Sequence, residues 1–272
     1  MKINNIQLLA IDCQNDFMDQ CGSAMPVPGA VEDMKRLARM IDRLSFQIKG
    51  ICVTLDNHNF VDIAHPIFWV DAEGNHPSPF KTIISLKDLE NGKWRTFNPY
   101  WQDRAYKYVK SLNDNGHNKL IIWEPHCFAG MYGSCIVSCV SDALLKWCCD
   151  NNAEINFIYK GMNKFTEHYS ALRADVPDPL DITTQTNIKL LDTLREADEV
   201  IVAGEALSHC VRNSVLDIIA ELGDEHAKKF ILLEDCCSSV KGFEYLGKEF
   251  IEIGKSKGMQ VMNSQDYSKG KI

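Results

Sequence analysis

The sequence has no long hydrophobic run, no concentrated basic stretch and no cysteine pair of the C-x-x-C type. A helix that crosses a membrane needs about 20 apolar residues in a row, so we expect no membrane partner. The net charge is −8, with 37 acidic and 29 basic residues. Because nucleic-acid binding needs a dense positive patch, we expect no nucleic-acid partner either. This composition favours a small molecule as the partner.

The eleven cysteines are an odd number and stand singly or in two adjacent pairs. This spacing matches neither a zinc knuckle nor a small disulfide-rich domain. The apolar run before Asp12 is also too short for a secretory signal peptide. We therefore expect reduced, mostly buried thiols and a cytoplasmic location.

Short apolar segments recur along the chain at 6–13, 48–56, 118–124, 155–160, 198–205, 228–236 and 259–262. Most are continuous runs, which is typical of parallel strands covered on both faces. Segments with apolar residues at helical spacing lie between them, at 31–47, 134–150 and 210–222. This alternation predicts a three-layer, doubly wound α/β fold of the Rossmann-like type with a mostly parallel sheet.

The region at about 66–117 breaks the alternation and is rich in proline, asparagine and aromatic residues. A structureless loop of this length is uncommon. We therefore expect an inserted elaboration with a helix at about 97–113, lying over the site as a lid or at a contact in a homo-oligomer. No repeat, low-complexity tract or linker divides the sequence, which predicts a single domain spanning 1–272.

Polar residues collect at the predicted carboxyl ends of the strands, where open α/β sheets place their sites. They are Asp12, Asp56, His58, His126, Lys160 and Cys210. Each alone has an ordinary explanation, since such aspartates are commonly caps, lysines are commonly solvated and buried cysteines are commonly inert. Their convergence on one edge of one sheet favours a catalytic site.

Cys210 is the candidate nucleophile. It follows a glycine-containing turn and opens a predicted helix, where the helix dipole favours the thiolate and free N–H groups can hold an oxyanion. Asp12 could be its base if burial raises the pKa of the carboxyl, and Lys160 would hold Asp12 or the thiolate in place. His209 is adjacent to Cys210, but neighbouring residues at a helix start point in different directions, so we do not expect a Cys–His dyad.

Asp56, His58 and His126 form a candidate metal site, with His65 as a possible fourth ligand. Carboxylate and imidazole ligands with open positions suit Zn²⁺, Fe²⁺ or Mn²⁺. The remaining histidines are expected at the surface: His76, His117, His168 and His226.

Five segments together resemble the isochorismatase-like cysteine hydrolases, and among them the nicotinamidases. In chain order they are AIDCQNDF, LDNHNF with a later histidine, WEPHC, YKG followed by EHYSAL, and AGEALSHCVRNSV. The resemblance implies the isochorismatase-like hydrolase fold. It also implies that Asp12, Lys160 and Cys210 are catalytic, and that the N–H groups of Ala206 and Cys210 form an oxyanion hole after a cis Glu205–Ala206 bond.

The same resemblance implies that Asp56, His58 and His126 are the metal ligands that distinguish the nicotinamidase branch. Phe17 and Trp123 match the aromatic residues that enclose the nicotinamide ring, and Tyr169 is a third candidate substrate contact. The implied reaction is hydrolysis of nicotinamide to nicotinate and ammonia through a thioester, assisted by a divalent metal, zinc above all, in the salvage of NAD.

Three other functions remain open at this point. One is another hydrolase of the same family, acting on a carbamoyl, pyrazinamide-like or vinyl-ether substrate. A second is a non-catalytic binding protein on the same fold. The third is a redox sensor, which only the number of cysteines supports.

Overall fold

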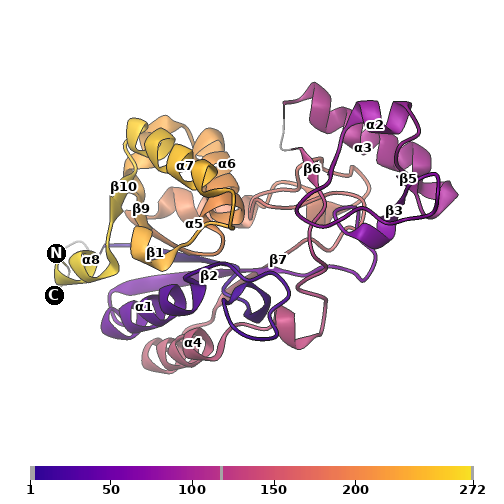
Figure 1. The fold of residues 1–272 in the computed structure, drawn as a ribbon. Helices are drawn as coiled ribbons and strands as arrows, with labels where there is room; N and C mark the ends of the chain where they lie inside the picture. Colours follow the sequence, from indigo (N-terminus) through magenta and orange to yellow (C-terminus); the bar gives the residue numbers. More distant parts are fainter. Residues whose placement is uncertain (1–3, 117–118, 271–272) are drawn as a thin grey trace.

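The computed structural model describes residues 4–116 and 119–270. Its central sheet has six parallel strands in the order β10–β9–β8–β1–β2–β7 (Figure 1). The strands are β1 (Ile6–Ile11), β2 (Ile48–Asp56), β7 (Asn156–Lys160), β8 (Glu199–Gly204), β9 (Phe230–Leu233) and β10 (Gln260–Met262). All residues of β1 are buried, as its continuous apolar run predicts.

Helices cover both faces of this sheet (Figure 1). One face carries α1 (Ala30–Arg43) and α4 (Ser138–Asn151), and the other carries α5 (Ile188–Glu196), α6 (Arg212–Leu222) and α7 (Glu244–Ser256). The short helix α8 (Ser264–Lys269) contacts α1. In α1, Met34, Leu37 and Ile41 recur at helical spacing and are fully buried, so the apolar stripe faces the core. The predicted three-layer α/β architecture is confirmed.

The segment between β2 and β7 contains small elements that stand apart from the sheet (Figure 1). Two antiparallel pairs are present, β3 (Trp69–Val70) with β5 (Arg95–Thr96), and β4 (Ile83–Ile84) with β6 (Leu120–Ile121). Two helices accompany them, α2 (Leu86–Glu90) and α3 (Gln102–Asp114). The helix expected at 97–113 is α3, preceded by a 3-10 turn at Pro99–Trp101.

The expectation of a sheet strand at 118–124 is wrong in the described part of that segment. Only Leu120 and Ile121 are extended and paired, and their partner is β4 outside the central sheet. The apolar character of the segment has another cause, because Ile122 and Trp123 are buried, and the Trp123 ring contacts Phe80 in the insertion and Tyr169 outside it. Residue 118, like His117, lies outside the described residues.

The helix expected at 210–222 begins later than its apolar pattern indicates. The regular helix α6 starts at Arg212, and the five residues before it, Leu207–Val211, form a π-helical turn. Other short turns have 3-10 geometry, at Asn15–Phe17, Pro66–Phe68, Tyr132–Ser134, Ile182–Thr184, Asp224–Lys229 and Glu234–Cys236. None of the helices in 4–116 and 119–270 is both long and apolar enough to cross a membrane.

Strand register brings the predicted site residues to one edge of the sheet. Asp56 and Lys160 are direct partners on the neighbouring strands β2 and β7. At the next pair, Ile11 at the end of β1 is the partner of Gly204 at the end of β8. A Cβ on Gly204 would lie 1.9 Å from the Ile11 carbonyl oxygen, and its φ is +121°, so only glycine fits this crossing.

Candidate active site

Lys160 contacts the two other residues that the sequence predicts to be catalytic. Its Nζ lies 2.8 Å from Oδ2 of Asp12 and 3.5 Å from Sγ of Cys210. All three side chains are buried, with Asp12 and Lys160 at 0% and 1% exposure. The other oxygen of Asp12, Oδ1, accepts a 2.6 Å hydrogen bond from the Thr54 hydroxyl. The carboxylate is therefore held from both sides, next to the thiol.

The electrostatics of this group differ from the sequence expectation at one residue. Burial raises the pKa of Asp12, although Lys160 opposes this, which is the direction expected for a base. Burial also raises the pKa of the Cys210 thiol well above its usual value, Lys160 lowers it, and the Asp12 carboxylate raises it further. The expected preference for a thiolate at a helix start is not found, because Cys210 lies inside the π-helical turn and is buried.

The turn that carries Cys210 also carries Ala206. The Glu205–Ala206 peptide bond is cis, as the family resemblance implies. The Ala206 carbonyl accepts hydrogen bonds from the N–H groups of His209 and Val211, at 3.0 and 3.2 Å, which folds the turn back on itself. Ala206 and Cys210 both line the cavity described below.

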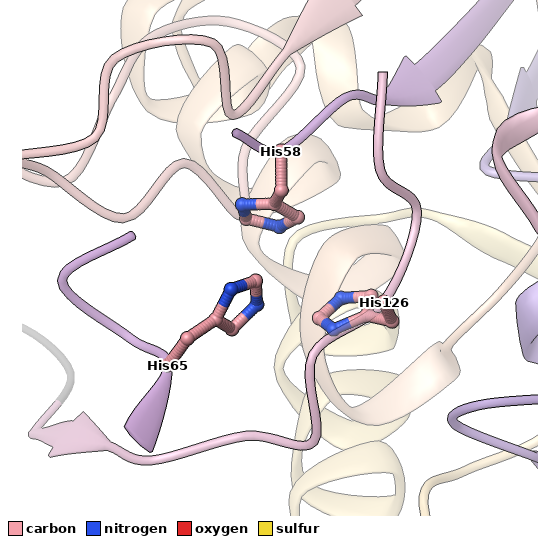
Figure 2. Close-up of side chains that lie close together, drawn as sticks. All are labelled: His58, His65 and His126. Carbon is pink, nitrogen blue, oxygen red and sulfur yellow. The ribbon is translucent and has the colours of Figure 1, made fainter. Parts of the chain in front are cut away.

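Three buried imidazoles point toward one another beside this group (Figure 2). Each of His58, His65 and His126 offers a nitrogen, and the three atoms lie within 4.8 Å of one another. The Asp56 carboxylate adjoins them, with Oδ2 at 3.2 Å from Nε2 of His58 and 3.4 Å from Nε2 of His126. The structure thus brings together all four residues of the predicted metal site.

The donor atoms of this cluster fit a divalent metal ion. Neither ring nitrogen of His65 has a hydrogen-bond partner in the described structure, although the side chain is fully buried. Burial, reinforced by the charges of His58 and His126, lowers the pKa of His65 to about 2, so the ring stays neutral and one nitrogen keeps a lone pair for a metal. His126 bonds through Nδ1 to the Glu124 carbonyl at 2.7 Å, which leaves Nε2 directed to the cluster.

Carboxylates keep the remaining members in place. Burial opposes a charge on His58, but Asp56 and Asp62 on its two sides raise its pKa well above the usual value. Asp62 contacts Nδ1 of His58 at 3.2 Å, an orienting contact that metal-binding imidazoles commonly have. Burial would raise the pKa of Asp56, yet His58 and Lys160 hold it well below its usual range.

A cavity of about 350 Å³ opens between the thiol and the histidine cluster. All three predicted substrate contacts, Phe17, Trp123 and Tyr169, line it. The indole N–H of Trp123 donates a 2.6 Å hydrogen bond to the Tyr169 hydroxyl, and the Phe17 ring lies 5.4 Å from the ring of His126. The remaining lining residues are Met25, Asp56, His126, Glu167, Ala206, His209, Cys210 and Val240. Aromatic side chains thus form part of the walls next to the thiol.

Asp16 positions the segment that carries His126. It lies in the 3-10 turn after β1 and accepts a 2.7 Å hydrogen bond from the N–H of Cys127. Gly133 packs so closely that a Cβ there would lie 2.0 Å from the Asp16 carboxylate. His126 therefore reaches the sheet edge through a loop and not as the end of a sheet strand.

Sequence reasoning also missed Glu167, His168 and His209 as parts of this region. Glu167 lines the cavity, and burial raises its pKa, although the charge of His58 opposes this. His168 was expected at the surface, but only 6% of it is exposed, because the chain turns inward beside Lys160. His209 lines the cavity with its ring 5.0 Å from that of Trp123. The sequence signal for Glu167 and His168 was the adjacent Tyr169 in the motif EHYSAL.

Comparison with known proteins agrees with this geometry. No family model matches the chain. The curated nicotinamidase of Saccharomyces cerevisiae is 26% identical over 219 residues, covering 79% of this chain and 82% of the yeast protein. The predicted resemblance to nicotinamidases is confirmed at the level of sequence.

Solved structures share the fold over nearly the whole chain. A nicotinamidase/pyrazinamidase from Acinetobacter baumanii has a TM-score of 0.66 at 19% identity and covers 98% of this chain and all of its own. The yeast nicotinamidase bound to the inhibitor nicotinaldehyde has a TM-score of 0.65 at 20% identity, with 95% and 99% covered. A pyrazinamidase of Pyrococcus horikoshii in complex with zinc scores 0.56, and an isochorismatase family protein from Desulfovibrio vulgaris scores 0.55. The chain has the isochorismatase-like hydrolase fold.

Proposed function

We propose that this chain, an isochorismatase-like hydrolase in fold, is a metal-assisted cysteine amidohydrolase that converts nicotinamide to nicotinate and ammonia. The observation that carries the proposal is the buried contact of Lys160 with both Asp12 and Cys210, next to a cavity that Cys210 and His126 line. A base, a nucleophile and a fixed cation within hydrogen-bond reach are what covalent amide hydrolysis needs.

The cavity suits a pyridine carboxamide. It is a small site that aromatic and polar side chains line together with the Cys210 thiol. Aromatic side chains, Phe17, Trp123 and Tyr169, supply walls against which a flat ring can pack. The carboxamide would lie next to the Cys210 thiol and the Ala206 backbone, which both line the cavity.

In the proposed reaction Asp12 accepts the proton of the Cys210 thiol as the sulfur attacks the carboxamide carbon. The developing oxyanion is held by the N–H groups of Ala206 and Cys210, and each such donor contributes roughly 3 kcal/mol to the transition state. Asp12 then gives the proton to the departing ammonia. Water, deprotonated by Asp12, attacks the thioester, releases nicotinate and restores the thiol.

Burial of the thiol opposes this proton transfer, and Lys160 offsets part of that effect. In bulk water a thiol would hold its proton far more tightly than an aspartate accepts one. Burial raises the pKa of Asp12, and Lys160 lowers the pKa of Cys210. Both effects reduce the gap between the two pKa values that burial of the thiol creates. Lys160 keeps its positive charge, because Asp12 and Asp56 raise its pKa despite its burial. It would thus stabilise the thiolate that forms.

Asp56, His58 and His126, with His65, would hold the divalent metal, and zinc suits an imidazole-rich set. When bound, the ion would supply a Lewis acid in the cavity wall, able to take the ring nitrogen of the substrate. Asp62 and the Glu124 carbonyl would fix the ring orientations of His58 and His126. The aromatic side chains that line the cavity beside them would exclude bulk water.

Ammonia release from nicotinamide by the purified protein tests the proposal. Cys210→Ala should abolish it, whereas Cys149→Ala, at an exposed thiol on α4, should leave it unchanged. Ammonia release that persists in Cys210→Ala would refute the nucleophile. A panel that includes pyrazinamide and carbamoyl amides would identify another substrate if nicotinamide is not hydrolysed.

All eleven cysteines are free, which supports a reducing compartment, and we propose a cytoplasmic role in the salvage of NAD.

A further inference from the structure

A second buried carboxyl group lies behind the turn that carries Ala206 and Cys210. Glu205 is fully buried, and its own N–H donates to the Ile11 carbonyl at 2.8 Å, so it sits at the junction of β8 with β1. Glu205 does not line the cavity. The mechanism proposed above does not use it.

Ser238 connects Glu205 to Asp33, which lies in the first turn of α1 and is also buried. The Ser238 N–H donates to Oε2 of Glu205 at 3.1 Å, and its hydroxyl donates to Oδ2 of Asp33 at 2.5 Å. The other oxygen of Glu205, Oε1, has no donor among the described residues. Both buried carboxyl groups therefore meet at Ser238, which donates to each of them. Because two negative charges in one buried site repel each other, one of the two groups should keep a proton.

The surroundings favour Glu205 as the carrier of that proton. Burial raises the pKa of Glu205 well above its usual value, and Asp33 raises it further. Burial raises the pKa of Asp33 as well, but Asp33 has the hydroxyl of Ser238 and the guanidinium of Arg36, at 2.5 Å, as compensating donors. The titratable and charged groups that face Glu205 are Asp33 on α1 with its partner Arg36, Asp19 before α1, Cys13 after β1 and Cys237 after β9.

The contact is continuous with the wall of the cavity. The Ser238 carbonyl accepts a 2.8 Å hydrogen bond from the N–H of Leu207, the residue after Ala206. Two residues on, the Val240 N–H donates to the hydroxyl of Ser208 at 3.1 Å, and Val240 lines the cavity. The segment 238–240 and the turn 205–208 are therefore bonded side by side, with Glu205 at one end of the ladder.

We propose that Glu205 is a positioning residue, which shares one proton with Asp33 and thereby fixes the turn whose N–H groups hold the oxyanion. The inference rests on the proposed function for its catalytic consequence. Loss of the shared proton would place two negative charges against each other in a buried site. The hydrogen bonds of Ser238 to the two carboxyl groups would then break, and the turn at Ala206 would no longer be held in place by this contact.

The sign of the pH effect follows from the direction of the shift. Glu205 has a higher pKa in the folded than in the unfolded chain, so above about pH 4.5 the folded state binds the extra proton. Stability contributed by this pair therefore falls as the pH rises from that value toward the folded pKa. Replacing the group with one that carries no titratable proton should remove this loss.

The experiment uses Glu205→Gln, Glu205→Leu and, as a matched control, Glu199→Gln at the opposite end of the same strand. Glutamine can donate to Asp33 and accept from Ser238, so we expect wild-type kcat at neutral pH and no fall in kcat at alkaline pH. Leucine can do neither, so kcat should fall by on the order of 10- to 100-fold with KM little changed, because a displacement of about 1 Å can cost that much. The control should keep the wild-type pH profile.

A substrate-free measurement separates this inference from the proposed function. The Tm of Glu205→Gln minus that of the wild type should increase by several degrees as the pH rises from 5 to 9. The same difference for Glu199→Gln should stay constant. A constant difference in Tm would overturn the shared proton, whatever the activity. An unchanged kcat in a folded Glu205→Leu protein, or an unchanged alkaline fall in Glu205→Gln, would overturn the positioning role.

Discussion

Lys160 and Asp56 face each other across β7 and β2, with Nζ of the lysine 3.1 Å from Oδ1 of the aspartate. The same ammonium group contacts Asp12 and Cys210. One buried cation therefore links the candidate catalytic group to the candidate metal site. A substitution in the catalytic group should therefore affect the metal site, and a substitution in the metal site should affect the catalytic group.

Lys160→Met should cost both activity and stability. It leaves Asp12 and Asp56 buried without their shared cation, and breaking a buried ion pair from one side costs about 3–5 kcal/mol. We expect a loss of that order in the free energy of unfolding, measured with urea, and a loss of nearly all ammonia release. Lys146→Met is the matched control, because Lys146 pairs with Asp150 at the exposed surface of α4. Equal effects of the two changes would contradict the central role of Lys160.

Gly161→Ala should damage the site through a single methyl group. Gly161 has φ +76°, and a Cβ there would lie 2.8 Å from Oδ1 of Asp56 and 3.2 Å from the ring of His58. Gly92→Ala imposes a similar strain, since φ is +69°, but its Cβ would meet nothing within 4 Å. We expect both variants to lose stability, by about 1 kcal/mol or more, and only Gly161→Ala to lose activity and metal. A similar loss of activity in both would show that backbone strain alone is responsible.

His65→Ala should release the metal without removing any hydrogen bond. Neither ring nitrogen of His65 has a partner within the described part of the chain, so its imidazole has no other polar role there. We expect lower metal content per protein chain, measured by elemental analysis after dialysis against a chelator. His76→Ala is the control, because His76 bonds to the Trp69 carbonyl away from the cluster. Unchanged metal content in His65→Ala would remove this residue from the ligand set.

His209→Phe should flatten the loss of stability in acid. Burial, with a smaller effect of Arg212, lowers the pKa of His209 to about 3 from its usual 6.5. Between these values only the unfolded chain binds the proton, so the free energy of unfolding falls with falling pH by about 1.4 kcal/mol per pH unit for this group. Urea unfolding between pH 4.5 and 7 should show a shallower slope in the variant. Parallel slopes would mean that the folded protein protonates His209 readily.

The sequence predicted the strand ends well because their pattern is local. A buried parallel strand reads as an apolar run, and the polar residue that ends it must lie at the sheet edge, as Asp12, Asp56 and Lys160 do. The family resemblance then supplied roles that no spacing could. The roles themselves stay predictions until the variants are measured.

The parts that escaped prediction depend on contacts distant in the sequence. The run at 118–124 has the composition of a strand, but Leu120 and Ile121 pair with β4 in the insertion and Trp123 packs against Tyr169, so the pattern alone could not place it. Glu205 meets Asp33 and Ser238 only because α1 and the segment after β9 converge on the end of β8. No periodicity marks a carboxyl group that becomes buried in this way.

The hydrogen bond from Trp123 N–H to the Ala64 carbonyl, 2.8 Å long, has a consequence for how such a protein can vary. It ties together the two points at which the inserted segment leaves and rejoins the rest of the chain. Since each doubling of a closed loop costs only about 0.6 kcal/mol in entropy, the loops beyond this tie can lengthen at little cost. Such insertions would leave the spacing of Asp12, Lys160 and Cys210 unchanged, while the hydrogen bond between Tyr108 and Glu167 keeps α3 against the rest of the chain.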